Sequence, residues 1–254
     1  MKPKIYIDGQ EGTTGLQIFD RLGSRTDIEL LHIDPARRKD IEERKKLLNE
    51  ADLVFLCLPD AAAVEAVSLI ENPAVKVIDA STAHRTDPAW DYGFSELSPA
   101  HRARIEASRR VANPGCHASG FIAGVYPLVK AGLIAPDRFL TCFSLTGYSG
   151  GGKKMIAEYE DPQRSPLYDS PKQYGLTQNH KHLKEMALVS GLTNYPVFCP
   201  VVSDFYSGMC VSVPLFKSDL KGTGEDIRQV YKSWYDGGIV SFAESPEGGV
   251  YASC

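Results

Sequence analysis

The chain has 254 residues, of which 43% are hydrophobic and 24% are charged, and its formal net charge is −4. This length and composition allow one large hydrophobic core or two smaller ones, so a folded globular protein is expected. The net charge provides no excess of cations for a nucleic-acid backbone. The longest apolar runs, such as residues 53–58, are far shorter than the roughly 18 residues that a membrane-spanning helix requires. Neither nucleic acid nor a membrane is expected as a partner.

Cysteine usage favours a reducing compartment. The six cysteines are scattered without a C-x-x-C pair or a short Cys/His cluster, which disfavours a disulfide framework and a structural zinc site. An apolar strand begins almost at once, at residues 5–7, which is not the pattern of a secretory leader. We therefore expect a cytoplasmic protein without a metal.

The first half of the chain alternates short apolar runs with polar segments of helix length, the pattern of successive β-α-β units. The expected strands are residues 4–8, 29–33, 53–58, 75–79 and 111–113, and the expected helices are residues 14–22, 41–49 and 61–70. These elements predict an α/β fold that begins with a Rossmann-type parallel sheet over residues 1–113.

The second half has a different pattern. Strand-like runs at residues 139–147 and 209–215 are separated by long segments rich in glycine, proline and tyrosine. This predicts a second domain of α+β type with a mixed sheet over residues 114–254. Residues 158–175, with three prolines and three tyrosines, are expected to form a long ordered loop or lid.

A glycine-rich turn follows the first expected strand. Gly9, Gly12 and Gly15 are spaced G-x-x-G-x-x-G, with Thr13 and Thr14 inside the motif, directly before an expected helix. In this position a backbone turns tightly and can hold a pyrophosphate at a helix N-terminus. Because the spacing departs from the commoner G-x-G-x-x-G, a turn without a ligand remains the alternative.

The second expected strand is followed by Asp34, Arg37, Arg38 and Lys39. An acidic residue in this position can hold the ribose hydroxyls of NAD, whereas arginines can hold the 2′-phosphate of NADP. Three cations against one acid favour NADP. A solvated basic cluster at the start of a helix is the alternative.

A candidate nucleophile lies at the start of the second domain. The sequence Asn113-Pro114-Gly115-Cys116 follows an expected strand and precedes the apolar run 121–128, so the sulfur is expected at a helix N-terminus. There the helix dipole stabilises a thiolate. Four other cysteines lie in or beside apolar runs and are expected to be ordinary core residues: Cys57, Cys142, Cys199 and Cys210.

Two histidines and a carboxylate form a second candidate cluster. His182 and Glu185 are three residues apart at an expected helix start, so the carboxylate could orient the imidazole, and His180 lies beside them. The sequence offers no obvious third metal ligand. A solvated polar helix start is the alternative.

A glycine run forms the third candidate motif. Ser149 is followed by Gly150, Gly151 and Gly152 and then by two lysines, after an expected strand. Such a loop can hold an anion. Simple loop flexibility is the alternative.

Together these motifs resemble those of the N-acetyl-γ-glutamyl-phosphate reductases, in their shorter subgroup, over essentially the whole chain. The motifs that carry the resemblance are Gly9-x-x-Gly12-x-x-Gly15, Asp79-Ala80-Ser81-Thr82-Ala83-His84-Arg85, Asn113-Pro114-Gly115-Cys116, Ser149-Gly150-Gly151-Gly152-Lys153 and His180-Lys181-His182. This family belongs to the same wider group as the aspartate-semialdehyde dehydrogenases. The resemblance implies NADPH-dependent reduction of an acyl phosphate to an aldehyde through a cysteine thioester, in arginine biosynthesis.

The resemblance also implies a role for each matching residue. Cys116 would be the nucleophile and His182 the general acid/base, with His180 as a close alternative. The glycine motif Gly9, Gly12 and Gly15, with Thr13 and Thr14, would hold the cofactor pyrophosphate; Arg37 and Arg38 would hold the 2′-phosphate; Ser149 and Gly150 would lie near the nicotinamide. The expected substrate-binding residues are Ser81, Arg85, Asn113 and Glu185, with Arg85 on the substrate phosphate.

The sequence departs from the family in two places. After the nucleophile the family has Tyr, a small residue and Thr, whereas this chain has His117-Ala118-Ser119. His117 is thus either an additional base or an aromatic replacement. Family members also continue past Cys254 with a segment that packs back on the cofactor domain, so a C-terminal truncation is expected.

Three alternative functions remain. The chain could be an aspartate-semialdehyde dehydrogenase-type enzyme, a truncated cofactor-binding or interaction protein without catalysis, or a cysteine hydrolase without a cofactor. The expected partners are a small acyl-phosphate substrate and further copies of the chain in a homo-oligomer.

Overall fold

The computed structural model describes residues 1–9, 13–244 and 249–253. The chain forms two compact units: Met1–Gly93 with Ala103–Pro114, and Phe94–Arg102 with Gly115–Cys254. Within the described residues, no helix is long and apolar enough to cross a membrane.

The first unit contains a six-stranded parallel sheet with the strand order β2-β1-β3-β4-β6-β5. Its strands are β1 (Lys4–Asp8), β2 (Glu29–Leu31), β3 (Leu53–Leu56), β4 (Lys76–Asp79), β5 (Asp91–Tyr92) and β6 (Arg110–Ala112). Parallel strands covered on both faces are expected to be continuous apolar runs. The predicted Rossmann-type sheet is confirmed, with strand ends one to two residues shorter than expected in several cases.

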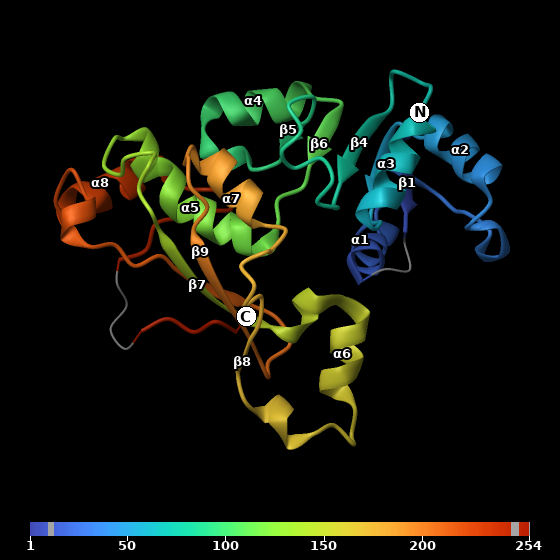
Figure 1. Ribbon diagram of the computed structural model, residues 1–254. Helices are drawn as coiled ribbons and strands as arrows, with labels where there is room; N and C mark the ends of the chain where they lie inside the picture. Colours follow the sequence, from blue (N-terminus) through green and yellow to red (C-terminus); the bar gives the residue numbers. More distant parts are fainter. Residues whose placement is uncertain (10–12, 245–248, 254) are drawn as a thin grey trace. The chain divides into compact units, whose positions relative to one another are not determined.

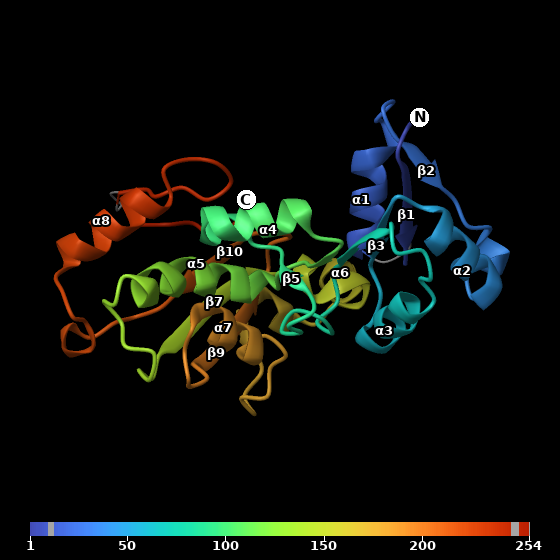
Figure 2. The same cartoon turned by 90° about the horizontal axis from the view of Figure 1, so that it is seen from above.

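Helices cover both faces of this sheet. Figure 2 shows α1 (Thr13–Gly23) on one face and α2 (Ile41–Glu50) and α3 (Asp60–Ser68) on the other. The Asp40 side chain accepts hydrogen bonds from the N–H groups of Glu42 and Glu43, which caps α2 and fixes its start. Leu47 and Leu48 of α2 pack into the core of the unit. A further helix, α4, spans Pro99–Ala107.

The carboxyl end of β1 is the point where the sheet topology reverses, because β2 lies on one side of β1 and β3 on the other. In open parallel sheets, ligands bind in the crevice at such a point. Gly9 leaves β1 there with φ +86°, and a Cβ on it would lie 2.4 Å from the Cys57 carbonyl oxygen. The close approach of these two segments therefore requires glycine at position 9.

The second unit contains a mixed four-stranded sheet with the order β10-β7-β9-β8. Its strands are β7 (Thr141–Gly147), β8 (Lys172–Gln173), β9 (Val197–Ser203) and β10 (Met209–Ser212). β7 and β9 are parallel, and the two outer pairs are antiparallel. The predicted mixed sheet is therefore confirmed.

One face of this sheet is covered by helices. In Figure 1, α5 (Cys116–Lys130) and α7 (Leu183–Ser190) lie together over β7 and β9. A Cβ at Gly120 would lie 2.5 Å from Val211 Cγ2, so glycine at this position lets α5 approach β10 closely. The last helix, α8 (Gly224–Trp234), lies along α5 (Figure 2), and Tyr235 just beyond it donates a hydrogen bond of 2.9 Å to the Ala123 carbonyl.

Two segments of the second unit have more regular secondary structure than the sequence predicted. The glycine run was expected to be a flexible or anion-binding loop, but Gly150 lies in a 3-10 turn (Tyr148–Gly151) and Gly152 begins α6 (Gly152–Glu160). The expected loop at residues 158–175 contains the end of α6, a 3-10 turn at Pro166–Asp169 and β8. Short polar segments such as β8 form strands only because a neighbouring strand offers hydrogen bonds.

Candidate active site

Cys116 is the first residue of α5 and is exposed, as its sequence context predicts. Backbone N–H groups at a helix N-terminus carry partial positive charge, which stabilises a thiolate over a thiol. The other cysteines with a shifted pKa behave in the opposite way. Burial raises the pKa of Cys57 to about 11 and that of Cys142 to about 12, so both are protonated at neutral pH.

The turn before Cys116 is held by a buried carboxylate. The Gly115 N–H donates a hydrogen bond of 2.7 Å to Glu185 Oε1, and Glu185 is only 1% exposed. Glu185 lies in the first turn of α7, so its carboxylate is near the N-termini of both α7 and α5. The predicted contacts of Glu185 with His182 and the substrate stay predictions, and the structure shows a contact that was not predicted, on the backbone beside Cys116.

His180 and His182 directly precede α7. Their ring centroids are 4.8 Å apart, and the His182 N–H donates a hydrogen bond of 3.2 Å to His180 Nδ1. Since Nδ1 acts as the acceptor, neutral His180 carries its proton on Nε2. Burial and the nearby Lys181 charge lower the pKa of His180. His182 itself is 3% exposed.

His117 joins these two residues in one histidine cluster, consisting of His117, His180 and His182. Its ring centroid lies 5.9 Å from that of His180 and 5.6 Å from that of His182. Burial, with a smaller effect of His180, lowers the pKa of His117 to about 4. At neutral pH this imidazole is therefore uncharged.

Both nitrogens of His117 have hydrogen-bond partners that sequence reasoning missed. Nδ1 lies 2.7 Å from Ser144 Oγ, and Nε2 lies 2.8 Å from Tyr174 Oη. Burial and the charge of Cys116 raise the pKa of Tyr174 to about 12. Ser144 carried a usable signal, because it is a polar residue on the inward face of β7, between the buried Cys142 and Thr146. Tyr174 lies in a polar, proline-rich segment and gave no such signal.

Ser149 and Gly150 lie at the carboxyl end of β7 in the second unit. The Ser149 N–H donates a hydrogen bond of 2.9 Å to the Tyr206 carbonyl. A Cβ at Gly150 would make only ordinary contact, 3.8 Å from Thr146 Oγ1, so the fold does not require glycine there. Their predicted place beside the nicotinamide stays a prediction.

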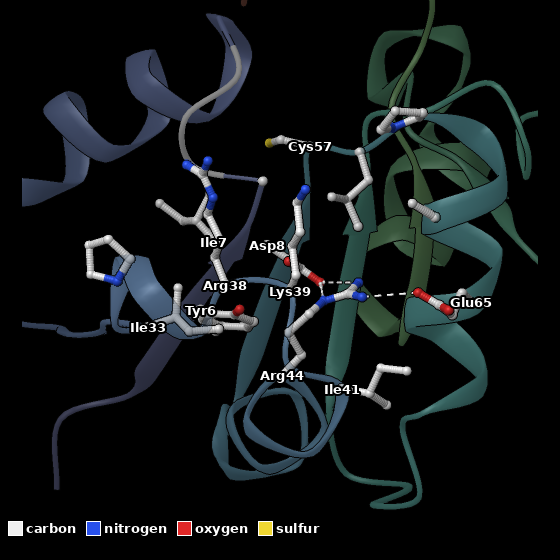
Figure 3. A pocket seen from close by; sticks show the side chains of 15 residues that line it. Tyr6, Ile7, Asp8, Ile33, Arg38, Lys39, Ile41, Arg44, Cys57 and Glu65 are labelled. Atoms are coloured by element: carbon white, nitrogen blue, oxygen red, sulfur yellow. Dashed lines mark hydrogen bonds and ion pairs between the residues drawn. The ribbon is translucent and has the colours of Figure 1, made fainter.

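The first unit has its own pocket, at the topological switch point of the sheet (Figure 3). It has a volume of about 580 Å³, and its lining includes Gly9, Arg38, Lys39 and Cys57. Cys57 follows β3 at the carboxyl edge of the sheet and lines this pocket, so it is more than an ordinary strand residue. The position and the cationic lining suit a nucleotide with phosphate groups.

A buried ion pair forms one wall of this pocket (Figure 3). Arg44 Nη2 lies 2.9 Å from Asp8 Oδ2, and Arg44 Nη1 lies 2.9 Å from Glu65 Oε2. Burial would lower the pKa of Arg44, but the hydrogen bonds to Asp8 and Glu65 raise it. Sequence reasoning missed this pair. Arg44 shares the buried face of α2 with Leu47 and Leu48, and a charged residue in such a row is a usable signal.

The three cations predicted to hold the 2′-phosphate, Arg37, Arg38 and Lys39, do not all line the pocket. Arg38 and Lys39 line the pocket. Arg37 instead pairs with Asp40 at 2.9 Å and with Glu43 at 2.6 Å. The Asp34 side chain accepts a hydrogen bond of 2.9 Å from the Ala36 N–H, so it caps the turn that presents these cations.

The remaining motif of the first unit follows β4. Asp79 is fully buried, and its carboxylate accepts hydrogen bonds of 2.9 Å from the Ser81 N–H and 2.6 Å from Ser81 Oγ. Arg85 is 9% exposed and donates 2.9 Å and 3.1 Å hydrogen bonds to the carbonyls of Asn113 and Ala80. Ser81 and Arg85 thus shape this turn, and Asn113 is exposed at the end of the unit.

The glycine motif is described only in part. Gly12 lies outside the described residues, and of Thr13 only its place as the first residue of α1 is described. Thr14 is exposed and Gly15 is buried, both within α1. In the described part of the chain, no three His, Cys, Asp or Glu side chains form a group that could hold a metal ion.

Comparison with known proteins identifies the family. Residues 4–105 match "Semialdehyde dehydrogenase, NAD binding domain", and residues 116–244 match "Semialdehyde dehydrogenase, dimerisation domain". N-acetyl-gamma-glutamyl-phosphate reductase of Trichormus variabilis is 48% identical over 242 residues, which cover 93% of this chain and 75% of that protein. The chain belongs to the N-acetyl-γ-glutamyl-phosphate reductase family. The enzyme of this name from Rhizobium meliloti is 47% identical over 238 residues, with coverage of 93% and 76%.

Solved structures of aspartate-semialdehyde dehydrogenases share the fold of this family member. Vibrio cholerae aspartate semialdehyde dehydrogenase II, complexed with ASA, matches with a TM-score of 0.64 at 14% identity, covering 91% of this chain and 79% of that one. The Candida albicans enzyme with NADP also has a TM-score of 0.64, at 16% identity, with coverage of 92% and 77%.

The buried, neutral state of His117 predicts a pH dependence of stability. The unfolded chain protonates this imidazole below a pH of about 6.5, whereas the folded protein does so only near a pH of about 4. Between these values the unfolded state binds more protons, so the free energy of unfolding falls as the pH is lowered, by at most about 1.4 kcal/mol per pH unit from this group. Urea unfolding of the wild type and of His117→Phe between pH 7 and pH 5 measures this effect. We expect a smaller pH slope in the variant, and equal slopes would contradict the assignment.

Proposed function

We propose that this chain is an NADPH-dependent N-acetyl-γ-glutamyl-phosphate reductase that forms N-acetylglutamate 5-semialdehyde in arginine biosynthesis. The observation that carries the proposal is the exposed Cys116 at the start of α5, in the same compact unit as the histidine cluster. The names of the curated relatives support this choice of substrate. The two domain matches support a nicotinamide cofactor and self-association.

The chemistry begins with the cysteine. The Cys116 thiolate attacks the acyl carbon, phosphate leaves, and a thioester remains. NADPH, when bound, supplies the hydride that reduces this thioester. The resulting thiohemiacetal collapses to the aldehyde, which regenerates the thiolate and requires proton transfer at the acyl oxygen.

We assign this proton transfer to His182. To accept a proton, neutral His180 would have to protonate Nδ1, which already accepts the His182 backbone N–H. That hydrogen bond and the lowered pKa of His180 both disfavour its charged form. These two effects favour His182 as the acid/base and leave His180 to position it.

The preference for NADP is assigned to Arg38 and Lys39. Both line the switch-point pocket, where the adenosine end of a dinucleotide is held in Rossmann-type sheets. Asp34 is engaged in its own turn, which supports NADP over NAD. Arg37 is not among the lining residues; its ion pairs with Asp40 and Glu43 hold the turn that carries Arg38 and Lys39.

A homo-oligomer is proposed through the face of the second sheet opposite α5 and α7, which no described helix covers. Phe143 of β7 and Val197 of β9 are 45% and 53% exposed on this face. Burying such side chains against a second copy is favourable, and the sheet lies within the region that matches a dimerisation domain. The reducing cytoplasm is the proposed compartment, because it keeps Cys116 as a thiol.

The catalytic role of Cys116 is tested by Cys116→Ser. We expect this variant to keep the wild-type fold and to lose NADPH oxidation at 340 nm with N-acetyl-γ-glutamyl phosphate, because a hydroxyl is far less acidic than a thiol. β-Aspartyl phosphate serves as the comparison substrate for the wild type. Turnover of Cys116→Ser near the wild-type rate would exclude the thioester mechanism, and NADPH binding without any turnover by the wild type would favour a binding protein.

The histidine assignment is tested by His182→Asn. We expect kcat to fall by roughly 10²–10⁴-fold, with little change in NADPH affinity. His180→Asn and His117→Asn are matched variants in the same cluster, and kcat should fall less in both of them than in His182→Asn. A greater loss in either of them would move the acid/base role to that residue.

The cofactor assignment is tested by comparing NADPH with NADH. Arg38→Ala should lower the preference for NADPH by roughly 10-fold or more, because a charge-assisted phosphate contact contributes about 1.5–3 kcal/mol. Arg37→Ala is the matched control and should change the preference less. An unchanged preference in Arg38→Ala would show that Arg38 is only surface charge.

The proposed oligomer is tested by Phe143→Lys, which introduces a charge into the uncovered sheet face. We expect sedimentation equilibrium to show weaker self-association than in the wild type, because the interface would have to desolvate an ammonium group. Ala157→Lys, at an exposed position of α6, is a control with the same change in charge. Equal association of all three proteins would exclude this face.

A further inference from the structure

The hydrogen bonds of His117 form a chain that runs from Ser144 in the sheet to Tyr174. Ser144 Oγ lies 2.7 Å from His117 Nδ1, and Tyr174 Oη lies 2.8 Å from His117 Nε2. We call these three residues the Ser144–His117–Tyr174 chain. His117 directly follows Cys116, and both begin α5.

The burial of Ser144 gives the chain a direction. Its side chain is fully buried, and among the described residues His117 Nδ1 is the only hydrogen-bond partner of its hydroxyl. If Nδ1 carried the proton, the buried hydroxyl proton of Ser144 would lack an acceptor, at a cost of about 1–3 kcal/mol. Ser144 therefore donates to Nδ1. Neutral His117 then carries its proton on Nε2 and donates it to Tyr174.

Tyr174 is left with a proton to donate. Its oxygen accepts from His117, and in the described part of the chain its hydroxyl has no second hydrogen-bond partner. The phenol is neutral at pH 7, because burial and the charge of Cys116 raise its pKa to about 12. Tyr174 is hydrogen-bonded to the residue that directly follows Cys116 in α5, which places the phenol on the side chain next to the proposed nucleophile. Tyr174 is only half-buried, so a bound acyl group can reach it.

We propose that the Ser144–His117–Tyr174 chain points the Tyr174 hydroxyl proton at the acyl oxygen of a substrate on Cys116, so that Tyr174 donates a hydrogen bond to the oxygen that becomes negative during reduction. This rests on the proposed reductase function. Tyr174 is then a catalytic residue, and His117 and Ser144 are positioning residues that act through it.

The step balances without a further reactant. Hydride forms a bond to the thioester carbon, and the electron pair of the C=O π bond moves to the oxygen. The Tyr174 hydroxyl keeps its O–H bond and stabilises the negative oxygen by hydrogen bonding. His182 protonates this oxygen to give the thiohemiacetal and takes the proton back as the C=O bond re-forms, the C–S bond breaks and the Cys116 thiolate leaves. The neutral state of His117 matters, because an imidazolium would donate from both nitrogens and could not accept from Ser144.

The kinetic test is a double-variant cycle. Tyr174→Phe should lower kcat by about 10²-fold, as expected for loss of one oxyanion donor, with KM and NADPH affinity nearly unchanged. His117→Phe should lower kcat less, by about 10-fold, because it frees the hydroxyl to rotate but keeps it. If His117 acts only through Tyr174, the double variant should match Tyr174→Phe alone. Multiplying losses in the double variant would overturn the proposal.

A rescue variant separates positioning from packing. His117→Gln keeps an amide oxygen that can accept from Ser144 and an N–H that can donate to Tyr174. It should recover most of the kcat that His117→Phe loses. Equal losses in His117→Gln and His117→Phe, with both proteins folded by circular dichroism, would contradict the positioning role.

A second measurement does not depend on the substrate. In ¹⁵N NMR spectra of the wild type at pH 7, the His117 ring should show a protonated Nε2 and an unprotonated Nδ1, and Ser144→Ala should weaken this preference. The opposite tautomer in the wild type would overturn the proposed direction. If the wild type has the expected tautomer but does not reduce N-acetyl-γ-glutamyl phosphate, the proposed function fails while the direction of the chain stands.

Discussion

The hydrogen bond from the Gly115 N–H to the Glu185 carboxylate joins two turns that carry the candidate chemistry. One turn begins α5 and presents Cys116 and His117; the other begins α7 and presents His180 and His182. A carboxylate with only 1% exposure would be costly to bury in an apolar environment. Here the N-termini of two helices surround it with partial positive charge. The same contact therefore satisfies the buried carboxylate and joins the turn that carries His180 and His182 to the turn that carries Cys116 and His117.

The histidine cluster illustrates what burial does to chemistry at neutral pH. Three imidazoles within 6 Å of one another would repel if they were all charged, and burial already disfavours the charged form of His117 and His180. His117 and His180 therefore act in this cluster as directed donors and acceptors rather than as positive charges. Each ring has a fixed neighbour, and the direction of each hydrogen bond decides which proton can reach a substrate.

In the first unit the pocket is shaped by the parallel sheet and by a buried ion pair. The parallel sheet brings the carboxyl ends of β1 and β3 together, and Gly9 allows the closest approach. The ion pair of Asp8 and Arg44 then fills the space beside them with groups that already have partners. Arg38 and Lys39 remain at the pocket lining, where a phosphate can compete for them.

Burial pattern explains which elements could be predicted. β3 is apolar over its whole length, and β1 and β4 have apolar centres between charged ends, so these three strands were predicted to within two residues. β9 was missed because Pro200 interrupts it, and proline is unusual inside a sheet. β8 has two exposed polar residues and exists only through its pairing with β9. Its formation depends on a partner distant in sequence.

The sequence by itself determined the two-part organisation, the glycine turn after β1 and the place of Cys116 at a helix start, because each depends on neighbours a few residues away. Only the tertiary structure decided which side chains form hydrogen bonds with His117. Ser144 is 27 residues and Tyr174 57 residues away along the chain, and neither spacing follows a helical or strand period. The tertiary structure also decided that Arg38 lines the pocket whereas Arg37 pairs with Glu43 of α2. Two adjacent arginines cannot be told apart in this way from the sequence. Local patterns fix elements, but hydrogen-bond partners across a packed interface depend on how those elements meet.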